Sequence, residues 1–590
     1  MKRTHTCGEL TAKNVDEKVK LAGWVHSRRD HGGIIFIDLR DRYGLTQVVF
    51  DPQKSIESQK AHAEAEHLRR EDVIQILGAV KKRKDGMINE NLPTGEIEVF
   101  VDRLKILSKA EIPPIEIDDK IVASDEVRLK YRYLDLRRPV MQKRLILRHN
   151  VVQAIREYFN SNGFLEIETP LLVRHTPEGA RDYIVPSRVN PGRFYSLPQS
   201  PQLYKQVLMV SGMDKYYQIA RCLRDEDLRA DRQPEFTQLD VEMSFIDEED
   251  VYSVGEGVIK NVFSSTLKTN LKTPFRRITY AETMDKYGCD KPDLRFGLEL
   301  VDVSSAVEKS EFEVFKKVIK EKGIVKCIIV EQSISRNEID DLANFVVQLG
   351  AKGLAWMKVS NGKLEGTPAK FFNEDAQEEL LKKTRAKEGS TIFFMADQPK
   401  KANDILSRLR TELGKRLKLI GESQFLFAWI IDFPLFEWNE EDEKWDAAHH
   451  IFTMPKEEHM QFLESNPEKV IGQLYDLTLN GVELASGSIR IHNSEIQEKV
   501  MKVIGIKKEE AEKKFGFLLE AFKYGAPPHG GFAVGIDRLV ALMAGINDIR
   551  EVLAFPKNKD AECPMDGCPS EVEEKQLKEL HLKSTFTKKQ

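Results

Sequence analysis

Charged residues gather between Arg221 and Asp240, in the stretch RCLRDEDLRADRQPEFTQLD. Arg224 and Glu226 stand two residues apart, and on a strand that spacing places both side chains on one face. An arginine beside a carboxylate can bind a phosphate together with an amine or the edge of a base. Apolar residues alternate on both sides of the stretch, which predicts two strands joined by a charged loop. On these residues alone, a solvated charged turn is the simpler interpretation.

Two further stretches have distinctive residue patterns. In GGFAVGIDRLVALM, glycines at 531 and 535 precede an acid, Arg538 and an apolar helix, but the spacing matches neither a dinucleotide fingerprint nor a P-loop. Upstream, apolar residues from Leu145 to Phe159 recur at helical spacing, and the strand-like FLEIETPLL follows and meets Pro170. A helix that leads into such a strand could form a subunit interface or ordinary packing.

Length and composition restrict the class of protein. A chain of 590 residues is too long for one core and suggests three or four domains. With a net charge of -5, any contact with nucleic acid must come from local patches. No apolar run fits a signal peptide or a membrane span, and the six cysteines lack disulfide spacing, so we expect a cytoplasmic protein. Cys563 and Cys568 have no second ligand pair, so no zinc is expected.

Residues 1–107 contain five short strand-like runs with one helical stretch between them, the pattern of a small Greek-key barrel of the OB type. The open face of such a barrel binds single-stranded nucleic acid through a stacking aromatic ring, cations for phosphates and an amide for a base edge. Phe36 could equally belong to the barrel core. The candidates for this contact, by residue type and position, are Arg28, Arg29, Phe36, Gln47 and Arg83.

The remaining chain divides by composition. Residues 108–131, with paired prolines, read as a hinge or linker. Residues 288–418 are rich in Lys and Glu and alternate strand-like with helical segments, which predicts an inserted α+β domain. In the flanking parts, 132–287 and 419–557, glycines interrupt the apolar runs in a similar way, so we expect the two parts to form one domain. Residues 558–590 are expected to form a C-terminal extension.

The helix and strand ending at Pro170, the Arg224–Asp240 hairpin and the block ending at Arg538, in this order, resemble motifs 1, 2 and 3 of the class II aminoacyl-tRNA synthetases. The OB domain, the segments TPEGARDYIVPS, LPQSPQ and RDEDLRADRQPEFTQ, and the insertion resemble the bacterial-type aspartyl-tRNA synthetases over nearly the whole chain. The resemblance implies a multidomain α+β fold: an N-terminal OB-fold β-barrel, an antiparallel-sheet catalytic core with helices, and an inserted α+β domain of the GAD type.

The chemistry of aspartate agrees with this resemblance. Its side-chain carboxylate calls for cations, and its ammonium group calls for acids. A lysine pocket would instead present acids to the side chain, which argues against a lysyl-tRNA synthetase. The residues that fit are Lys205 and Arg490 as cations, Glu178 and Asp240 as acids, and Gln202, Gln238 and His449 as further hydrogen-bond partners.

The resemblance also implies the ATP site. Arg224 would bridge the substrate carboxylate and the α-phosphate, Arg538 would meet the γ-phosphate, and these two are the predicted catalytic residues. Asp476 and Glu483 look like the carboxylates that hold Mg²⁺ against the phosphates. The other predicted ATP contacts are Asp225, Glu226, Gln233, Glu483, Gly535, Ile536 and Asp537.

The implied reaction has two steps. The α-carboxylate of aspartate attacks the α-phosphorus, pyrophosphate leaves, and the 3′-OH of tRNA then takes the aspartyl group. Catalysis rests on positioning and electrostatics, because no protein base is required. One departure is visible: the chain reads LASGS where the family pattern is closer to LGGGS, so Ala485 and Ser486 add bulk near the site.

Members of this family differ in which tRNA they accept. Those with relaxed specificity tend to have a histidine after the first barrel strand and a small residue in a later anticodon-facing loop, where this chain has His31 and Gly86. The resemblance therefore predicts a homodimer that charges tRNA(Asp) and also tRNA(Asn). The alternatives are a strictly tRNA(Asp)-specific enzyme, an asparaginyl-tRNA synthetase, or a non-catalytic nucleic-acid-binding relative. The complete set of ATP residues argues against the last.

Overall fold

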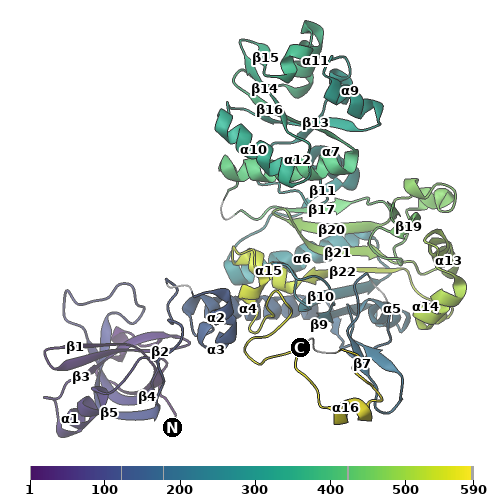
Figure 1. Cartoon of the computed structure of the whole chain (residues 1–590). Coiled ribbons are helices and arrows are strands. Elements are labelled where there is room, and N and C mark those ends of the chain that lie inside the picture. Colours follow the sequence, from purple (N-terminus) through teal and green to yellow (C-terminus); the bar gives the residue numbers. More distant parts are fainter. Residues whose placement is uncertain (1, 121–122, 177–178, 422–423, 587–590) are drawn as a thin grey trace. The chain divides into compact units, whose positions relative to one another are not determined.

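The computed structural model describes residues 2–120, 123–176, 179–421 and 424–586 (Figure 1). The chain forms two compact units. The first comprises Met1–Leu147, Leu228–Ala230 and Arg550–Glu571, and the second comprises Arg148–Asp227, Asp231–Ile549 and Val572–Gln590. The finer domain boundaries stay a prediction. Within the described ranges, no helix combines the length and the apolar character that a membrane crossing needs.

The first unit contains a closed five-stranded barrel with the strand order β1-β2-β3-β5-β4, as predicted. Alternation along the strands buries Ile35 and Ile37 in the barrel core and leaves Phe36 on the outer face. Phe36 therefore does not belong to the barrel core. The elements are η1 (Ala12–Asn14), β1 (Lys18–His31), β2 (Ile34–Asp41), β3 (Gly44–Phe50), α1 (Ile56–Ala65), β4 (Val73–Lys82) and β5 (Ile97–Ser108).

Short helices follow the barrel: α2 (Asp125–Lys130), α3 (Arg132–Asp135) and the start of α4 (Pro139–Ser161). Asp135 is fully buried there and accepts hydrogen bonds from Arg128, Arg132 and Arg138. Arg132 also donates to three carbonyl oxygens near η5 (Ile549–Val552), including that of Leu553 at 2.8 Å. Asp135 therefore orients the arginine that holds the segment after residue 549.

Asp135→Asn is expected to destabilise this cluster by about 3–5 kcal/mol near neutral pH, because it leaves buried guanidinium groups without their carboxylate. Burial alone would raise the pKa of Asp135, but hydrogen bonds from Arg128 and Arg138 outweigh it and hold the pKa below 3.8. A lowered pKa gives stability above the unfolded value that is lost as pH falls through the folded value. Urea denaturation of both proteins, near neutral pH and below pH 3.8, measures the difference, which should shrink in acid.

The matched control is Asp119→Asn. Asp119 lies 3.4 Å from Arg138 but is 40% exposed, so its loss should change stability by only about 0–1 kcal/mol. If the loss of unfolding free energy caused by Asp135→Asn stayed the same in acid, it would contradict the predicted link between stability and the ionisation of Asp135.

The second unit is built on an eight-stranded sheet with the order β11-β17-β20-β21-β22-β10-β9-β6. Its pairs are antiparallel except for β11 with β17 and β6 with β9. The strands are β6 (Leu165–Glu166), β9 (Lys215–Leu223), β10 (Glu235–Ser244), β11 (Arg276–Thr279), β17 (Phe427–Ile431), β20 (Leu474–Leu479), β21 (Val482–Ile489) and β22 (His529–Gly535). The helices of this part are α4, α5 (Gln202–Val210), α6 (Glu248–Leu267), α7 (Tyr280–Tyr287), α13 (Ser494–Val503), α14 (Lys508–Phe522), α15 (Ile536–Met543) and α16 (Glu574–Glu579).

The predicted hairpin of β9 and β10 is present, but β9 ends at Leu223. Arg224 and Glu226 therefore lie in the loop rather than on one strand face, which corrects the argument from strand spacing. Small elements complete this part: the hairpins β7 (Ile184–Pro186) with β8 (Phe194–Ser196) and β18 (Phe436–Asn439) with β19 (Lys444–Ala447), and η3 (Glu457–Phe462) and η4 (Pro467–Lys469).

A separate five-stranded sheet, of order β12-β13-β16-β14-β15, lies within the stretch between β11 and β17 and appears at the top of Figure 1. It belongs to the inserted part and carries two apolar clusters. Its elements are β12 (Leu300–Asp302), α8 (Ser304–Val307), α9 (Glu313–Lys320), β13 (Ile324–Val330), α10 (Arg336–Gln348), β14 (Ala355–Ser360), β15 (Lys363–Glu365), η2 (Pro368–Phe371), α11 (Glu374–Thr384), β16 (Thr391–Asp397) and α12 (Pro399–Arg416).

Candidate active site and nucleic-acid interface

Two cations and two carboxylates meet in the interior beside the large sheet. Asp240 and Glu242 share one face of β10, Lys205 comes from α5, and Arg490 follows β21. Lys205 Nζ lies 3.0 Å from Asp240 Oδ1 and 3.4 Å from Glu242 Oε2. Arg490 Nε donates to Glu242 Oε1 at 2.9 Å. All four residues are at most 1% exposed, so each charge depends on the others.

The two carboxylates of this cluster differ. Burial raises the pKa of Asp240, against the opposing charge of Lys205. Burial would also raise the pKa of Glu242, but the charges of Arg490 and Lys205 outweigh it and lower that pKa. Among the described residues, the buried Asp240 Oδ2 has no hydrogen-bond partner. Glu242 thus anchors both cations, while Asp240 keeps an oxygen with which to accept a ligand amine.

Glu242 was missing from the sequence prediction. Its signal was available, because it stands two residues after Asp240 in an alternating strand. A glycine makes room for it: a Cβ on Gly531 would lie 2.5 Å from Glu242 Oε2 and 2.0 Å from the carbonyl oxygen of Val241. The predicted pair Lys205 and Arg490 is brought together around an acid that the sequence reasoning had not included.

Asp476 and Glu483 form a second acidic pair on β20 and β21. A bulge after Leu477 pairs Thr478 with Glu483, which puts Glu483 on the same face as Asp476. Burial raises the pKa of Asp476 to about 7, with the charge of Glu483 acting in the same direction and His449 opposing. Asp476 Oδ1 is buried without a hydrogen-bond partner in the described chain. Two close carboxylates with an unsatisfied oxygen fit a hard divalent cation.

The strand register connects this pair with the buried cluster. Asp240, Ala533, Ser486 and Asp476 stand side by side on four neighbouring strands. Ser486 Oγ lies 3.4 Å from His449 Nδ1, and His449 Nδ1 lies 3.8 Å from Asp476 Oδ1. Ser486, the departure from the family pattern, therefore contacts the predicted ligand His449.

Arg224 is half-buried at the end of β9. Its backbone N–H donates to the carbonyl of Pro234, its Nε donates to the carbonyl of Gln199 at 3.4 Å, and its guanidinium lies 5.1 Å from the centroid of the Phe236 ring. The described residues offer it no carboxylate within salt-bridge distance. An arginine that is oriented in this way but not neutralised can bind an anionic ligand.

Other residues of the hairpin loop already have partners within the protein. Glu226 pairs with Arg232 at 2.6 Å, and Asp225 pairs through its backbone with Arg181. Gln233 is buried, with its side chain near the carbonyl of Arg232. A contact of Glu226 with ATP would require that it leave Arg232 or share it.

The block after β22 divides into exposed and buried parts. Gly535 caps α15, and Arg538 reaches the carbonyl of Glu483 and lies 3.5 Å from Asp231. Ile536 is fully buried. The Asp537 carboxylate accepts hydrogen bonds from Arg148 and from the backbone N–H of Thr237. The side chains of Ile536 and Asp537 are therefore occupied within the fold, which leaves Arg538 as the side chain of this block with access to a ligand.

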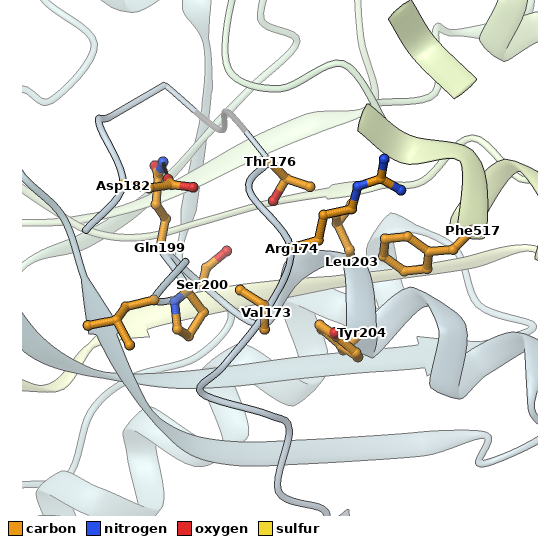
Figure 2. A pocket seen from close by; sticks show the side chains of 11 residues that line it. Val173, Arg174, Thr176, Asp182, Gln199, Ser200, Leu203, Tyr204 and Phe517 are labelled. Atoms are coloured by element: carbon orange, nitrogen blue, oxygen red, sulfur yellow. Dashed lines mark hydrogen bonds between the residues drawn. The ribbon is translucent and has the colours of Figure 1, made fainter. Parts of the chain in front are cut away.

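Figure 2 shows the cavity beside α5, lined by Gln199, Asp182 and Leu203 among others. Gln199 donates to the carbonyl of Ala180 at 2.8 Å and accepts from the N–H of Ala180, so it ties down the segment that follows residue 178. Glu178 itself lies outside the described residues. Gln202, at the start of α5, has a buried Nε2 without a partner in the described parts, and Gln238 accepts from Cys222 Sγ.

A polar row crosses the outer face of the barrel. Arg29 donates to Asp38 and, at 3.3 Å, to Gln47 Oε1, and Gln47 donates to Glu98 at 2.9 Å. Phe36 lies opposite Arg29 and packs edge-on to His31, with ring centroids 6.3 Å apart. A ring, an arginine and an amide on one face suit a base and its phosphate.

Two of the predicted barrel residues lie apart from this row. Arg83 is buried and donates to the carbonyl of Ile97, and burial lowers its pKa. Arg28 donates to the carbonyl of Ala65 in α1, so the structure does not bring it together with Phe36. His31 and Gly86 are both exposed, and Gly86 has a φ of 82°, which favours glycine.

Known proteins match both parts of the chain. The family described as tRNA synthetases class II (D, K and N) matches residues 124–559, and the OB-fold nucleic acid binding domain matches residues 19–107. The aspartate--tRNA(Asp/Asn) ligase of Caldanaerobacter subterraneus is 54% identical over 585 residues, which cover 99% of this chain and 98% of that protein.

Solved structures share the fold. An asparaginyl-tRNA synthetase from Pyrococcus horikoshii has a TM-score of 0.60 at 20% identity and covers 94% of this chain and 98% of its own. A putative aspartyl-tRNA synthetase from Leishmania major has a TM-score of 0.61 at 20% identity, with 94% of each chain covered. The predicted fold class is confirmed. On the full-length likeness and the two matching families, the chain belongs to the class II aminoacyl-tRNA synthetases of the D, K and N group.

Proposed function

We propose that the chain activates L-aspartate with ATP and transfers it to the 3′ end of tRNA(Asp) and tRNA(Asn). The buried cluster of Lys205 and Arg490 around Glu242 carries this proposal, because two fixed cations suit a side-chain carboxylate better than the neutral amide of asparagine. The fold alone does not discriminate, since asparaginyl enzymes share it. None of the six cysteines forms a disulfide, which supports a cytoplasmic location.

The site residues have separate roles in the first step, the activation of aspartate by ATP. Lys205 and Arg490 bind the side-chain carboxylate of the substrate aspartate. Asp240 Oδ2, which has no hydrogen-bond partner among the described residues, accepts a hydrogen bond from the substrate ammonium group. Arg224 holds the α-carboxylate against the α-phosphate of ATP and stabilises the charge that develops as the new bond forms. Arg538 binds the γ-phosphate, which leaves as part of pyrophosphate. The product is aspartyl-adenylate, and in the second step the ribose 3′-OH of tRNA attacks its carbonyl. The ester bond to tRNA forms, the bond to the phosphate breaks, and AMP leaves with the hydroxyl proton on its phosphate.

Asp476 and Glu483 are the residues that would hold Mg²⁺, because the orphaned oxygen of Asp476 and the shared strand face fit a hard cation with oxygen ligands. Bound there, Mg²⁺ would neutralise phosphate charge and assist the departure of pyrophosphate. Ser486 and His449 lie beside Asp476 and connect this end of the site to the aspartate pocket.

Charging assays with purified tRNAs test the function. With labelled aspartate, both tRNA(Asp) and tRNA(Asn) should be charged, with kcat/KM values within about tenfold of each other, a difference of about 1.4 kcal/mol. Labelled asparagine and lysine should give no charging, because the pocket presents cations. The exposed His31 and Gly86 support acceptance of both anticodons. Charging of tRNA(Asp) alone would contradict the relaxed specificity, and charging with asparagine would contradict the substrate.

We also propose a homodimer. Apolar side chains lie exposed on β6 at the edge of the large sheet, in the loop after it and on the β7–β8 hairpin: Leu165 at 52%, Leu171 at 54%, Leu172 at 53%, Ile184 at 61% and Phe194 at 45% exposure. Exposed apolar residues grouped at a sheet edge are typical of a subunit interface. At micromolar concentration we expect sedimentation as two chains, and Leu171→Asp combined with Leu172→Asp should give monomers.

The matched control for the dimer is Val347→Asp on α10. Val347 is 50% exposed, but it lies in the inserted part, so the variant should sediment as wild type. A wild-type chain that sediments as one copy would contradict the homodimer.

A further inference from the structure

The C-terminal part of the first unit carries a group of donor side chains with no role in the synthetase site. Cys563 and Cys568 face each other across a tight turn, where the Cys563 N–H donates to the Cys568 carbonyl at 2.8 Å and the Gly567 N–H donates to the Cys563 carbonyl at 2.8 Å. The turn places Asp566 beside both thiols. One donor atom from each of the three side chains lies within 4.8 Å of the others.

Asp566 supplies what the sequence reasoning lacked. The sequence has no second Cys or His pair beside Cys563 and Cys568 and therefore predicts no zinc. In the structure the Asp566 carboxylate accepts from the Cys568 N–H at 3.0 Å. The third donor is thus a carboxylate oxygen that lies beside the two sulfurs.

We infer that Cys563, Cys568 and Asp566 form a binding site for a thiophilic divalent cation of the Zn²⁺ type. Two sulfurs and a carboxylate oxygen are ligands that Zn²⁺ accepts, and the four-residue gap between the cysteines lies within the spacing of zinc-binding turns. Two sulfurs on one tetrahedral Zn²⁺ stand roughly 3.8 Å apart, so small side-chain rotations from the present positions suffice. Water fills the fourth position, because Asp566 and Cys568 are accessible from solvent.

Binding has a definite proton balance. Neither cysteine forms a disulfide, so both sulfurs are available as ligands. Each sulfur must lose its proton to ligate, so one cation releases two protons per chain. The bound cation then holds the turn closed in the same segment whose first residues accept hydrogen bonds from Arg132.

Co²⁺ is the probe, used with the full-length chain purified under reducing conditions. We expect one Co²⁺ per chain with thiolate-to-cobalt absorption, the release of two protons, displacement by Zn²⁺, and slower amide exchange in residues 557–569. Cys563→Ser and Cys568→Ser should each lose the absorption, and Asp566→Asn should weaken binding. Two matched controls should bind as wild type: Asp560→Asn in the same segment and Cys289→Ser elsewhere.

Three results would overturn the site. The first is no thiolate absorption with excess Co²⁺, and the second is absorption that survives in Cys563→Ser. The third is that the chain binds no metal, while hydrogen peroxide oxidises Cys563 and Cys568 to a disulfide. The two cysteines would then be a disulfide-forming pair. Circular dichroism of each variant confirms folding, and Asp566→Asn, which alters an exposed side chain, keeps the test informative if a cysteine variant misfolds.

Discussion

Arg224→Ala is expected to lower kcat for aspartate-dependent ATP–pyrophosphate exchange by about 10²–10³-fold or more, the usual loss when one oriented donor to the developing charge is removed. Arg224 is held by Phe236 and the carbonyl of Gln199, and the described residues do not neutralise it. It is half-buried, so stability should change little. Exchange kinetics at saturating ATP, with thermal unfolding of the same samples, measure both effects.

Arg221→Ala is the matched control, because Arg221 lies on β9 shortly before Arg224 but pairs with Glu235 at 2.6 Å and faces solvent. Its exchange rate should stay near that of the wild type. Near-normal exchange in Arg224→Ala would remove this residue from the chemistry. An equal loss in both variants would point to damage of the hairpin rather than to a role at the phosphate.

Glu242→Gln is expected to destabilise the catalytic part by about 3–5 kcal/mol, because a buried carboxylate that serves two cations is replaced by a neutral amide. Lys205 would keep Asp240, but Arg490 would lose its acid. The KM for aspartate should rise as well, since the two cations lose their common anchor. Urea denaturation near neutral pH measures the loss of stability, and pyrophosphate exchange with varied aspartate measures KM.

The control for this substitution lies on the same strand. Glu235→Gln removes a carboxylate that is 39% exposed and pairs with Arg221 at the surface, so the expected change is about 0–1 kcal/mol. If Glu242→Gln were as mild as Glu235→Gln, the buried cluster would not depend on its central acid, and the proposed binding of aspartate by two fixed cations would lose its support.

Much of the fold was predictable from local patterns. Alternation of apolar residues gave the barrel strands and the β9–β10 pair, because a strand with one buried face repeats every two residues. The end of β9 at Leu223 was not predictable in this way, since a charged loop can continue a strand or leave it. The two residues first considered for one strand face, Arg224 and Glu226, therefore have different surroundings.

The sequence by itself determined the order of the three blocks and the residue types of the site. It also determined that Asp240 shares a face of β10 with the residues two positions away. The tertiary structure alone decided three contacts: Glu242 between Lys205 and Arg490, Glu483 on the face of Asp476, and Asp566 beside two thiols. The physical reason is register. A single bulged residue reverses the face of every side chain beyond it, and a turn or a cross-strand contact joins residues whose distance in sequence carries no information about their distance in space.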